Sequence, residues 1–386
     1  MDFEFSEEET LFREEIREYL TKNLRPMVPK IDESGIPRSF VKDASKLGIW
    51  AMPVSKDVGG QEASFIMSSI AAEEIARADF SMATVVMFLL ESGWGYVLDK
   101  YGSKSIREEV LPRVTSGDWF LGIASTEPSG GSDIGNIKTR AIRENDKYVI
   151  NGEKSYISGV LEAKDWGGGH LTLVRTSPNG NKGISMIYVP INEEGIEIAK
   201  INNMGRMGIS SAIIRYNNVK IPAKNIVGEE NKGFYQAMDG FNHARVLVSA
   251  ACIGASEAIF DIGIEYLKNR EAFGKKLKDF QSIAFEAADL KTRIEMARLL
   301  TYKAAWALNH EEKYKSEIPS LVAMTKMVGP QVAFDVVKSV MMWMGAYGYS
   351  KDALIEIAFR GIVSYIVGAE GALNIMRIII SKGIFG

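Results

Sequence analysis

The strongest constraint on the fold is a long run of helical periodicity in the second half of the chain. Residues 235–270 read YQAMDGFNHARVLVSAACIGASEAIFDIGIEYLKNR and place apolar side chains at i, i+3 and i+4 over many turns. Residues 280–310, residues 320–345 and the C-terminal segment repeat this pattern. Because each apolar face must be buried against another, these long helices predict a four-helix bundle.

The middle of the chain has a different character. The segments DKYVINGEKSYIS, HLTLVRTSPNGNKGISMIYVP and SSAIIRYNNVKIP are short β-type runs separated by turn residues. The Asn151-Gly152 pair predicts a hairpin turn. Residues 120–228 are therefore expected to form a β domain, closed as a barrel or a sandwich so that its strand edges are covered.

Helical patterns also fill the first part of the chain. Ser6 and Glu9 have the spacing of a capping box before an apolar-periodic stretch. The segment SMATVVMFLLESGWGYVLDKYG is apolar nearly all round, which predicts a buried helix. The predicted fold class is α+β and multidomain, with an N-terminal all-α domain (1–119), a middle β domain (120–228) and a C-terminal helical bundle (229–386).

Composition narrows the class of protein. The 386 residues are 46% hydrophobic and 25% charged, and the formal net charge is −3, so no electrostatic footprint for nucleic acid or an anionic membrane is present. The single cysteine, Cys252, excludes a disulfide within the chain and a metal site built on several cysteines of one chain. The acidic N-terminus lacks a signal-peptide core. The sequence contains no uninterrupted apolar stretch of about 20 residues, so it predicts no membrane span. We expect a cytoplasmic protein.

Three glycine-containing breaks are candidate ligand loops. They read TEPSGGSD at residues 126–133, NREAFGKKLKDFQ at residues 269–281 and MGAYGYSKD at residues 344–352. Glycine lets a backbone approach a ligand closely, and an arginine such as Arg270 can hold a pyrophosphate through two oxygens. Judged singly, the first and third breaks are more often ordinary turns, and the second is as readily a solvated turn as a ligand loop. Neither a Walker loop nor a Rossmann fingerprint is present.

Taken together, and in this order, the three breaks resemble those of the acyl-CoA dehydrogenase family. That family has TEPxxGSD entering its β domain, RxxFGxxLxxxQ between bundle helices, GGxGY before the last helices and EGT near its end. The resemblance covers nearly the whole chain, including NGEKSYIS, NMGRMGISSAIIRYNNVKIPAKNIVG and NKGFYQAM.

The resemblance implies FAD-dependent oxidation of an acyl-CoA thioester to the trans-2-enoyl-CoA, as in fatty acid β-oxidation. A base removes the α-proton while the β-hydride passes to flavin N5, and an electron-transfer flavoprotein takes the electrons. It also implies a homo-oligomer, typically a tetramer arranged as a dimer of dimers. The implied FAD contacts are Ile123, Ser125, Thr126, Tyr156, Ile157 and Ser158 from the β domain, and Arg270, Phe273, Gln281, Met342 and Gly345, which reach FAD of a neighbouring subunit. The implied contacts to substrate or CoA are Ser132, Asn242, Arg245 and Gly371.

Glu370 is the implied catalytic base, because it matches the Glu of EGT. A thioester α-proton is weakly acidic, and a carboxylate among apolar neighbours such as Val367 and Leu373 is poorly solvated and therefore more basic. Other branches of the family place the base at the position of Ala244, which cannot accept a proton.

The chain departs from the family pattern at several points. Ala372 replaces the Thr of EGT, and Met342 and Ala346 replace a Gln and a Gly before the last helices. The segment from Arg360 to Glu370 is one residue longer than usual. On a continuous helix one extra residue rotates a side chain by about 100°, which leaves the direction of Glu370 open.

Other functions within the same fold stay open. An acyl-CoA oxidase or a flavin monooxygenase shares the architecture, and a non-catalytic acyl-CoA-binding subunit would tolerate the departures. Leu89, Leu90 and Trp94 could close the acyl pocket for a short or branched chain, although they are interpreted as core. Ala83 stands where glutaryl-CoA dehydrogenases carry an arginine, which disfavours a dicarboxylyl substrate.

Overall fold

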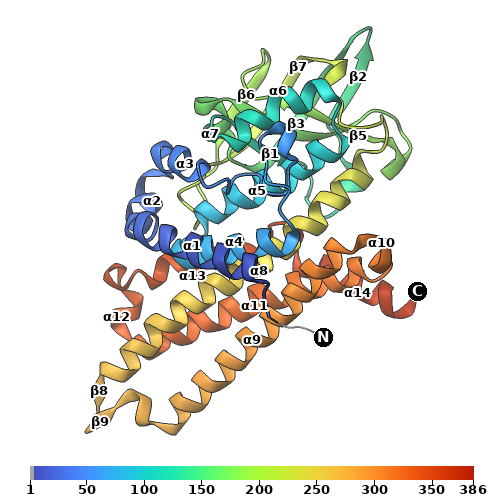
Figure 1. Cartoon of the computed structure of the whole chain (residues 1–386). Helices are drawn as coiled ribbons and strands as arrows, with labels where there is room; N and C mark the ends of the chain where they lie inside the picture. The colour runs from blue at the N-terminus through green and yellow to red at the C-terminus, as the bar shows by residue number, and fades with distance from the viewer. Residues whose placement is uncertain (1–3) are drawn as a thin grey trace.

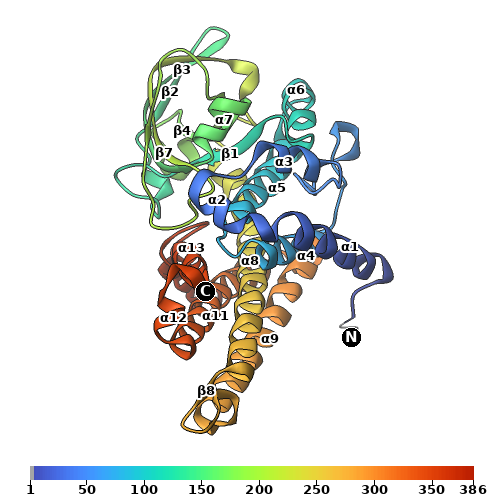
Figure 2. The same cartoon turned by 90° about the vertical axis from the view of Figure 1, so that its left-hand side faces the viewer.

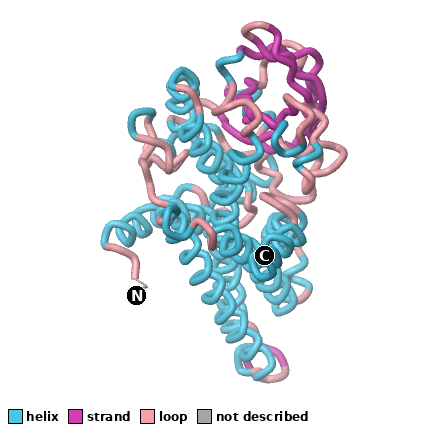
Figure 3. Tube along the Cα trace, turned by 90° about the vertical axis from the view of Figure 1, so that its right-hand side faces the viewer, coloured by secondary structure: helices cyan, strands magenta, loops and turns pink. Residues whose placement is uncertain are grey.

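Helices, strands and helices follow one another along the computed structural model, which describes residues 4–386 (Figure 1). The strands gather at one end, and the long C-terminal helices extend from them toward the other end (Figure 3). The predicted multidomain α+β class is confirmed. The division at residues 119/120 and 228/229 stays a prediction.

The N-terminal region is helical, as predicted. The Ser6 hydroxyl accepts a hydrogen bond from the Glu9 main-chain N–H at 3.2 Å, and the Glu9 carboxylate accepts from the Ser6 N–H at 2.9 Å, which confirms the capping box. The helices of this region are α1 (Glu7–Asn23), α2 (Val28–Ser34), α3 (Arg38–Ser45), α4 (Phe65–Ala78), α5 (Ala83–Tyr101) and α6 (Lys104–Thr115).

Helix α5 is buried along nearly its whole length, as its apolar pattern predicts. Leu89, Leu90 and Trp94 belong to the hydrophobic core, which agrees with their interpretation as core residues. Glu91 lies on the same helix with a relative exposure of 0%, and neither of its carboxylate oxygens has a hydrogen-bond partner among residues 4–386. Burial therefore raises the pKa of Glu91 well above its usual value.

The middle region is one curled sheet. Its strands run in the order β1-β4-β2-β3-β7-β6, with β5 paired to β4. The β1–β4 pair is parallel, whereas β3–β7, β4–β5 and β6–β7 are antiparallel. The elements are β1 (Phe120–Ala124), β2 (Arg140–Glu144), β3 (Lys147–Ser158), α7 (Val160–Trp166), β4 (Gly168–Arg175), β5 (Ile184–Pro190), β6 (Ile196–Lys200) and β7 (Ser211–Pro222).

The hairpin turn predicted at Asn151-Gly152 is wrong. Both residues lie inside β3, and the turn between β2 and β3 falls earlier, where Glu144 pairs with Lys147 and Asn145 has a φ of 56°. The register of β3 against β7 shifts between Ile150 and Gly152, so the glycine forms an irregularity in the ladder. Gly in a strand marks such a bulge as readily as it marks a turn, and the sequence signal is the same for both.

Helix α8 (Gly233–Asn269) is the axis of the C-terminal region (Figure 2). At 1.5 Å per residue its 37 residues span about 55 Å. It packs against α4, α5 and three C-terminal helices, α9, α11 and α13. The remaining elements are β8 (Glu271–Ala272), β9 (Lys275–Lys276), α9 (Gln281–Asn309), α10 (Glu311–Tyr314), α11 (Ile318–Met344), α12 (Ala346–Tyr349), α13 (Ile355–Val367) and α14 (Leu373–Phe385).

By length and composition alone α8 could cross a membrane, since an 18-residue window in it reaches a mean hydropathy of 1.6. In the structure 72% of that window is buried inside the molecule. This is the situation of a core helix in a soluble protein.

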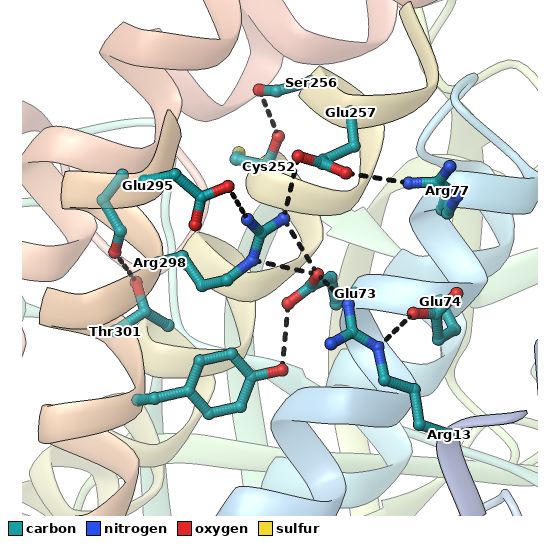
Figure 4. A network of polar contacts seen from close by, with 12 residues as sticks. Arg13, Glu73, Glu74, Arg77, Cys252, Ser256, Glu257, Glu295, Arg298 and Thr301 are labelled. Atoms are coloured by element: carbon teal, nitrogen blue, oxygen red, sulfur yellow. Dashed lines mark hydrogen bonds and ion pairs between the residues drawn. The ribbon is translucent and has the colours of Figure 1, made fainter. Parts of the chain in front are cut away.

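A buried ion-pair network ties the N-terminal helices to the bundle (Figure 4). Glu73 of α4 accepts from Arg13 of α1 at 2.7 Å, from Arg298 of α9 at 3.2 Å and from the Tyr302 hydroxyl at 2.9 Å. Arg298 also contacts Glu257 of α8 at 3.2 Å. Four helices therefore share one set of charges, in which the buried Glu73 carboxylate accepts from donors on two other helices, α1 and α9.

Glu91→Gln is expected to stabilise the protein relative to wild type, increasingly so as the pH rises. Above a pH of about 4.3 the unfolded chain loses the Glu91 proton while the folded protein keeps it. Wild-type stability then falls by about 1.4 kcal/mol per pH unit until the folded pKa is reached, and Gln avoids this loss. Thermal unfolding of both proteins between about pH 5 and pH 8 measures the difference.

Glu74→Gln is the matched control, because Glu74 is a buried carboxylate in the opposite environment. Burial alone would raise its pKa, but Arg17 and Arg13 outweigh burial and hold the pKa below its usual value. That variant should lose stability at neutral pH, and the loss should fade as the pH falls. A Glu91→Gln protein that is less stable than wild type at every pH would contradict the expectation.

Candidate active site

The first part of the site is the loop that follows β1. Ser125 and Thr126 are half-buried there, and the loop is fixed to β3 by Lys154 and Ser155. The ammonium of Lys154 donates to the Ser125 carbonyl at 3.1 Å and to Glu127 at 2.9 Å, and the Ser155 N–H donates to the Thr126 carbonyl at 2.9 Å. The structure thus brings the residues after β1 beside the end of β3.

The end of β3 presents Tyr156 outward. Its φ is 59°, the register against β7 shifts between Lys154 and Ile157, and its side chain is 66% exposed. A bulge of this kind turns one side chain out of the strand alternation. Ile157 is buried beside it, and the Ser158 carbonyl contacts a ring nitrogen of His170 at 3.0 Å.

The second part of the site is the loop between α13 and α14, which carries Glu370. Helix α13 ends at Val367, and Ala369, Glu370 and Gly371 follow with φ values of 50°, 57° and 118°. Because Glu370 lies outside the helix, the extra residue before it does not rotate it by a helical step. The direction of its side chain is set by the contacts of the loop instead.

Glu370 combines burial with nearby positive charge. Part of the residue is exposed, but its Oε2 atom is fully buried and has no hydrogen-bond partner among residues 4–386. Burial raises the pKa of Glu370 to about 7, against the opposing effect of Arg245, Lys326 and Arg206. A carboxylate with this pKa can take up a proton near neutral pH.

Arg245 holds the main chain of Glu370 rather than its carboxylate. Its Nε donates to the Glu370 carbonyl at 2.8 Å, and its Nη1 donates to the Asn242 side-chain oxygen at 3.2 Å. Burial lowers the pKa of Arg245 to about 10. The structure therefore brings Asn242, Arg245, Glu370 and Gly371 together, and a Cβ on Gly371 would lie 3.7 Å from the Arg245 guanidinium.

The sheet and the Glu370 loop meet through the segment before β7. Arg206 lies over the ring of Tyr365 with its Cζ 5.8 Å from the ring centre, and Arg360 donates to the Met204 carbonyl at 3.2 Å. In the sheet, Ser211 at the start of β7 pairs with Ser158 at the end of β3. The segment before β7 thus contacts α13, the helix that precedes Glu370, while β7 itself pairs with the end of β3.

A further pocket lies at the far end of α8. It measures about 450 Å³ and is lined by residues of α8, the β8–β9 hairpin and the end of α11, among them Arg270 and Gly345. Phe273 is 95% exposed at the hairpin and Met342 is 76% exposed, and neither lines this pocket. Gln281, also exposed, begins α9 outside the lining.

The β8–β9 hairpin beside this pocket and the curled sheet lie at opposite ends of the molecule (Figures 1 and 2). At the sheet end of α8, a Cβ on Gly233 would come within 2.4 Å of the Ser185 main chain in β5. Arg270 follows the other end, about 55 Å away along the helix. Within one chain, the implied FAD contacts therefore fall into two separate groups. Ser132, an implied contact to substrate or CoA, lies exposed in the loop after β1.

Lys154, Lys326 and Arg206 were not singled out from the sequence. Lys326 is a lone cation in the apolar run SLVAMTKMVGPQVAF, and this is the one sequence signal that could have drawn attention to it. Lys154 and Arg206 lie in ordinary polar surroundings in the sequence, and only the tertiary structure shows their contacts.

Comparisons with known proteins agree with this geometry. Family models for the acyl-CoA dehydrogenase N-terminal, middle and C-terminal domains match residues 6–118, 122–219 and 231–385. Cyclohexane-1-carbonyl-CoA dehydrogenase of Geobacter metallireducens is 31% identical over 385 residues, covering 99% of this chain and 98% of that protein. The caffeyl-CoA reductase-Etf complex subunit CarC of Acetobacterium woodii is 30% identical over 381 residues and 98% of both chains.

A solved structure of butyryl-CoA dehydrogenase from Megasphaera elsdenii has the same fold, with a TM-score of 0.92, 27% identity and coverage of 100% of both chains. The three domain models together match most of the chain, and the Geobacter relative matches it over nearly its whole length. This chain therefore belongs to the acyl-CoA dehydrogenase family of oxidoreductases.

Proposed function

We propose that this protein oxidises an acyl-CoA thioester to its trans-2-enoyl-CoA, with Glu370 as the base that removes the α-proton. The observation that carries the proposal is the state of the Glu370 carboxylate. Among the described residues 4–386 its Oε2 is buried and has no hydrogen-bond partner, while Arg245 donates to the Glu370 main-chain carbonyl and not to the carboxylate. A structural glutamate in such a place would be expected to have a partner.

The residues present fit FAD, on which the family generally depends. The hydroxyls of Ser125 and Thr126 make no hydrogen bond within residues 4–386, and Gly131 lies close to Thr126, where an added Cβ would be 3.1 Å from its hydroxyl. At the other end, the guanidinium of Arg270 has no acidic partner in the described chain. These groups can bind a polar ring edge and a pyrophosphate, respectively.

The roles of the cofactor and of the surrounding residues follow from these contacts. FAD, when bound, supplies the acceptor for the β-hydride. Ser125, Thr126 and Tyr156 would hold its ring. The main-chain N–H of Glu370, which donates to no acceptor within residues 4–386, is available to the thioester carbonyl and can stabilise negative charge as the α-proton leaves.

Glu370→Gln is expected to slow flavin reduction by an acyl-CoA by about 10²–10⁴-fold, because Gln keeps the shape but cannot take the proton. Anaerobic stopped-flow bleaching of the flavin measures the rate. In the wild type the rate of flavin reduction should rise with pH around 7, because Glu370 ionises there. This rising limb of the pH profile should be missing in the variant.

FAD content and enoyl-CoA binding serve as controls for the Glu370→Gln variant and should change little. A rate within a few-fold of wild type would remove Glu370 as the base.

We also propose that the protein works as a homo-oligomer, a tetramer arranged as a dimer of dimers. The support is the separation of the two groups of implied FAD contacts along α8, which leaves Arg270 available to complete an FAD site in a neighbouring subunit.

Arg270→Ala should therefore lower the FAD content well below the wild-type value of about one per subunit, since it removes a bidentate phosphate donor. Lys268→Ala, which removes an exposed cation two residues away, should leave the FAD content unchanged. Sedimentation followed at the flavin absorption band tests the assembly, and a stable flavin-loaded monomer would contradict it.

We propose that the protein acts in the cytoplasm.

The proposed electron acceptor is an electron-transfer flavoprotein. The name of the Acetobacterium relative joins it to an Etf complex, which supports this partner. We expect substrate-reduced protein to be reoxidised much faster by an electron-transfer flavoprotein than by dissolved oxygen. Comparable peroxide release with oxygen alone would favour an acyl-CoA oxidase instead.

A further inference from the structure

Lys326 lies in the first half of α11 with a relative exposure of 0%. Its ammonium donates to the Tyr365 carbonyl at 2.7 Å and to the Gly368 carbonyl at 3.1 Å. Within residues 4–386 no carboxylate forms an ion pair with it. A fully buried lysine normally has a carboxylate partner, so this position needs another explanation.

The two acceptors of Lys326 lie at the C-terminal end of α13. The last carbonyls of a helix lack partners within the helix and carry the negative end of its dipole. Tyr365 belongs to the last turn of α13, and Gly368 is the first residue after it. Lys326 therefore caps α13 at the point where the chain leaves the helix toward Glu370.

The segment beyond this cap has an unfavourable backbone. Ala369 and Glu370 both have positive φ, a region that residues with a Cβ rarely adopt. Such conformations persist only where the surroundings impose them. Here two buried cations do so from opposite sides, Lys326 before the strained residues and Arg245 at the Glu370 carbonyl.

Both cations contact main-chain oxygens and leave the Glu370 carboxylate unpaired. The charged and titratable groups that face Glu370 are Arg245 from α8, Lys326 from α11, Arg206 from the segment before β7 and Tyr365 from α13. Those that face Lys326 are Glu370, Arg245 and the buried Cys252 of α8. Burial lowers the pKa of Lys326 to about 8, so below that pH Lys326 acts on Glu370 through both the loop conformation and its positive charge.

We propose that Lys326 is a positioning residue of the active site: its ammonium fixes the loop that carries Glu370 and supplies positive charge that favours the ionised form of the carboxylate. This inference rests on the proposed role of Glu370 as the base.

The test uses the full-length, FAD-loaded protein carrying Lys326→Met, which fills a similar volume without charge or donors. Flavin reduction by an acyl-CoA should slow by about 10–100-fold, the order expected when a reacting group is displaced by about 1 Å. Loss of the positive charge should also move the rising limb of the pH profile to higher pH, because Glu370 then holds its proton more tightly.

Thr325→Val is the matched control, because Thr325 is buried on the same helix and its hydroxyl donates only to the Val322 carbonyl within that helix. It should change neither the rate nor the pH profile. A purely structural role for Lys326 predicts a lower melting temperature with the pH limb unmoved, and that result would overturn the proposal.

Two further variants keep the outcomes separate. Lys326→Gln retains one possible donor without charge, so it should show the same pH shift with a smaller loss of rate. If neither Lys326 variant yields FAD-loaded protein, Lys326 serves folding and the proposal is wrong. If flavin reduction is unchanged in Glu370→Gln, the assignment of Glu370 as the base is wrong. If flavin reduction is slow in Glu370→Gln but normal in Lys326→Met, only the proposed role of Lys326 is wrong.

Discussion

The rest of the structure depends on the packing of α8 against helices on every side. Its small residues allow this: a Cβ on Gly254 would lie 1.8 Å from the Glu73 carbonyl of α4, and one on Gly240 would lie 2.7 Å from the Trp94 ring of α5. Such close approach places Glu257 within reach of the shared charges of α1, α4 and α9. It also sets Arg245 opposite the loop that carries Glu370.

Buried charge is used in contrasting ways in this protein. Glu74 is held by arginines, whereas within residues 4–386 neither Glu91 nor Oε2 of Glu370 has a hydrogen-bond partner. Arg245 and Lys326 lie near Glu370 but donate to main-chain carbonyls. Only the last arrangement makes a carboxylate both ionisable and free near neutral pH. Whether a buried carboxylate can act as a base therefore depends both on nearby positive charge and on the lack of a hydrogen-bond partner that would occupy its oxygens.

Much of the architecture could be predicted from the sequence, because helical and β periodicities are local signals. The buried character of α5 and the capping box at Ser6 follow from a few neighbouring residues. The turn at Asn151-Gly152 was misplaced because a glycine in a strand bulge gives the same signal. For the site, the motifs led to Glu370 and Arg270, but Lys326 acts across 42 residues on a carbonyl, and no pattern of side chains encodes that contact.

The apolar character of α8 has a consequence for synthesis. As it leaves the ribosome, this segment is hydrophobic enough to resemble a membrane-inserting helix. Helices α4 and α5, which pack on it in the native protein, precede it in the chain and are already available when it emerges. N-terminal regions fold first during synthesis, so the order of the domains lets the nascent chain cover part of this apolar helix at once. The remaining face is covered only when α9 and α11 follow, and until then it is exposed to aggregation or to capture by a chaperone.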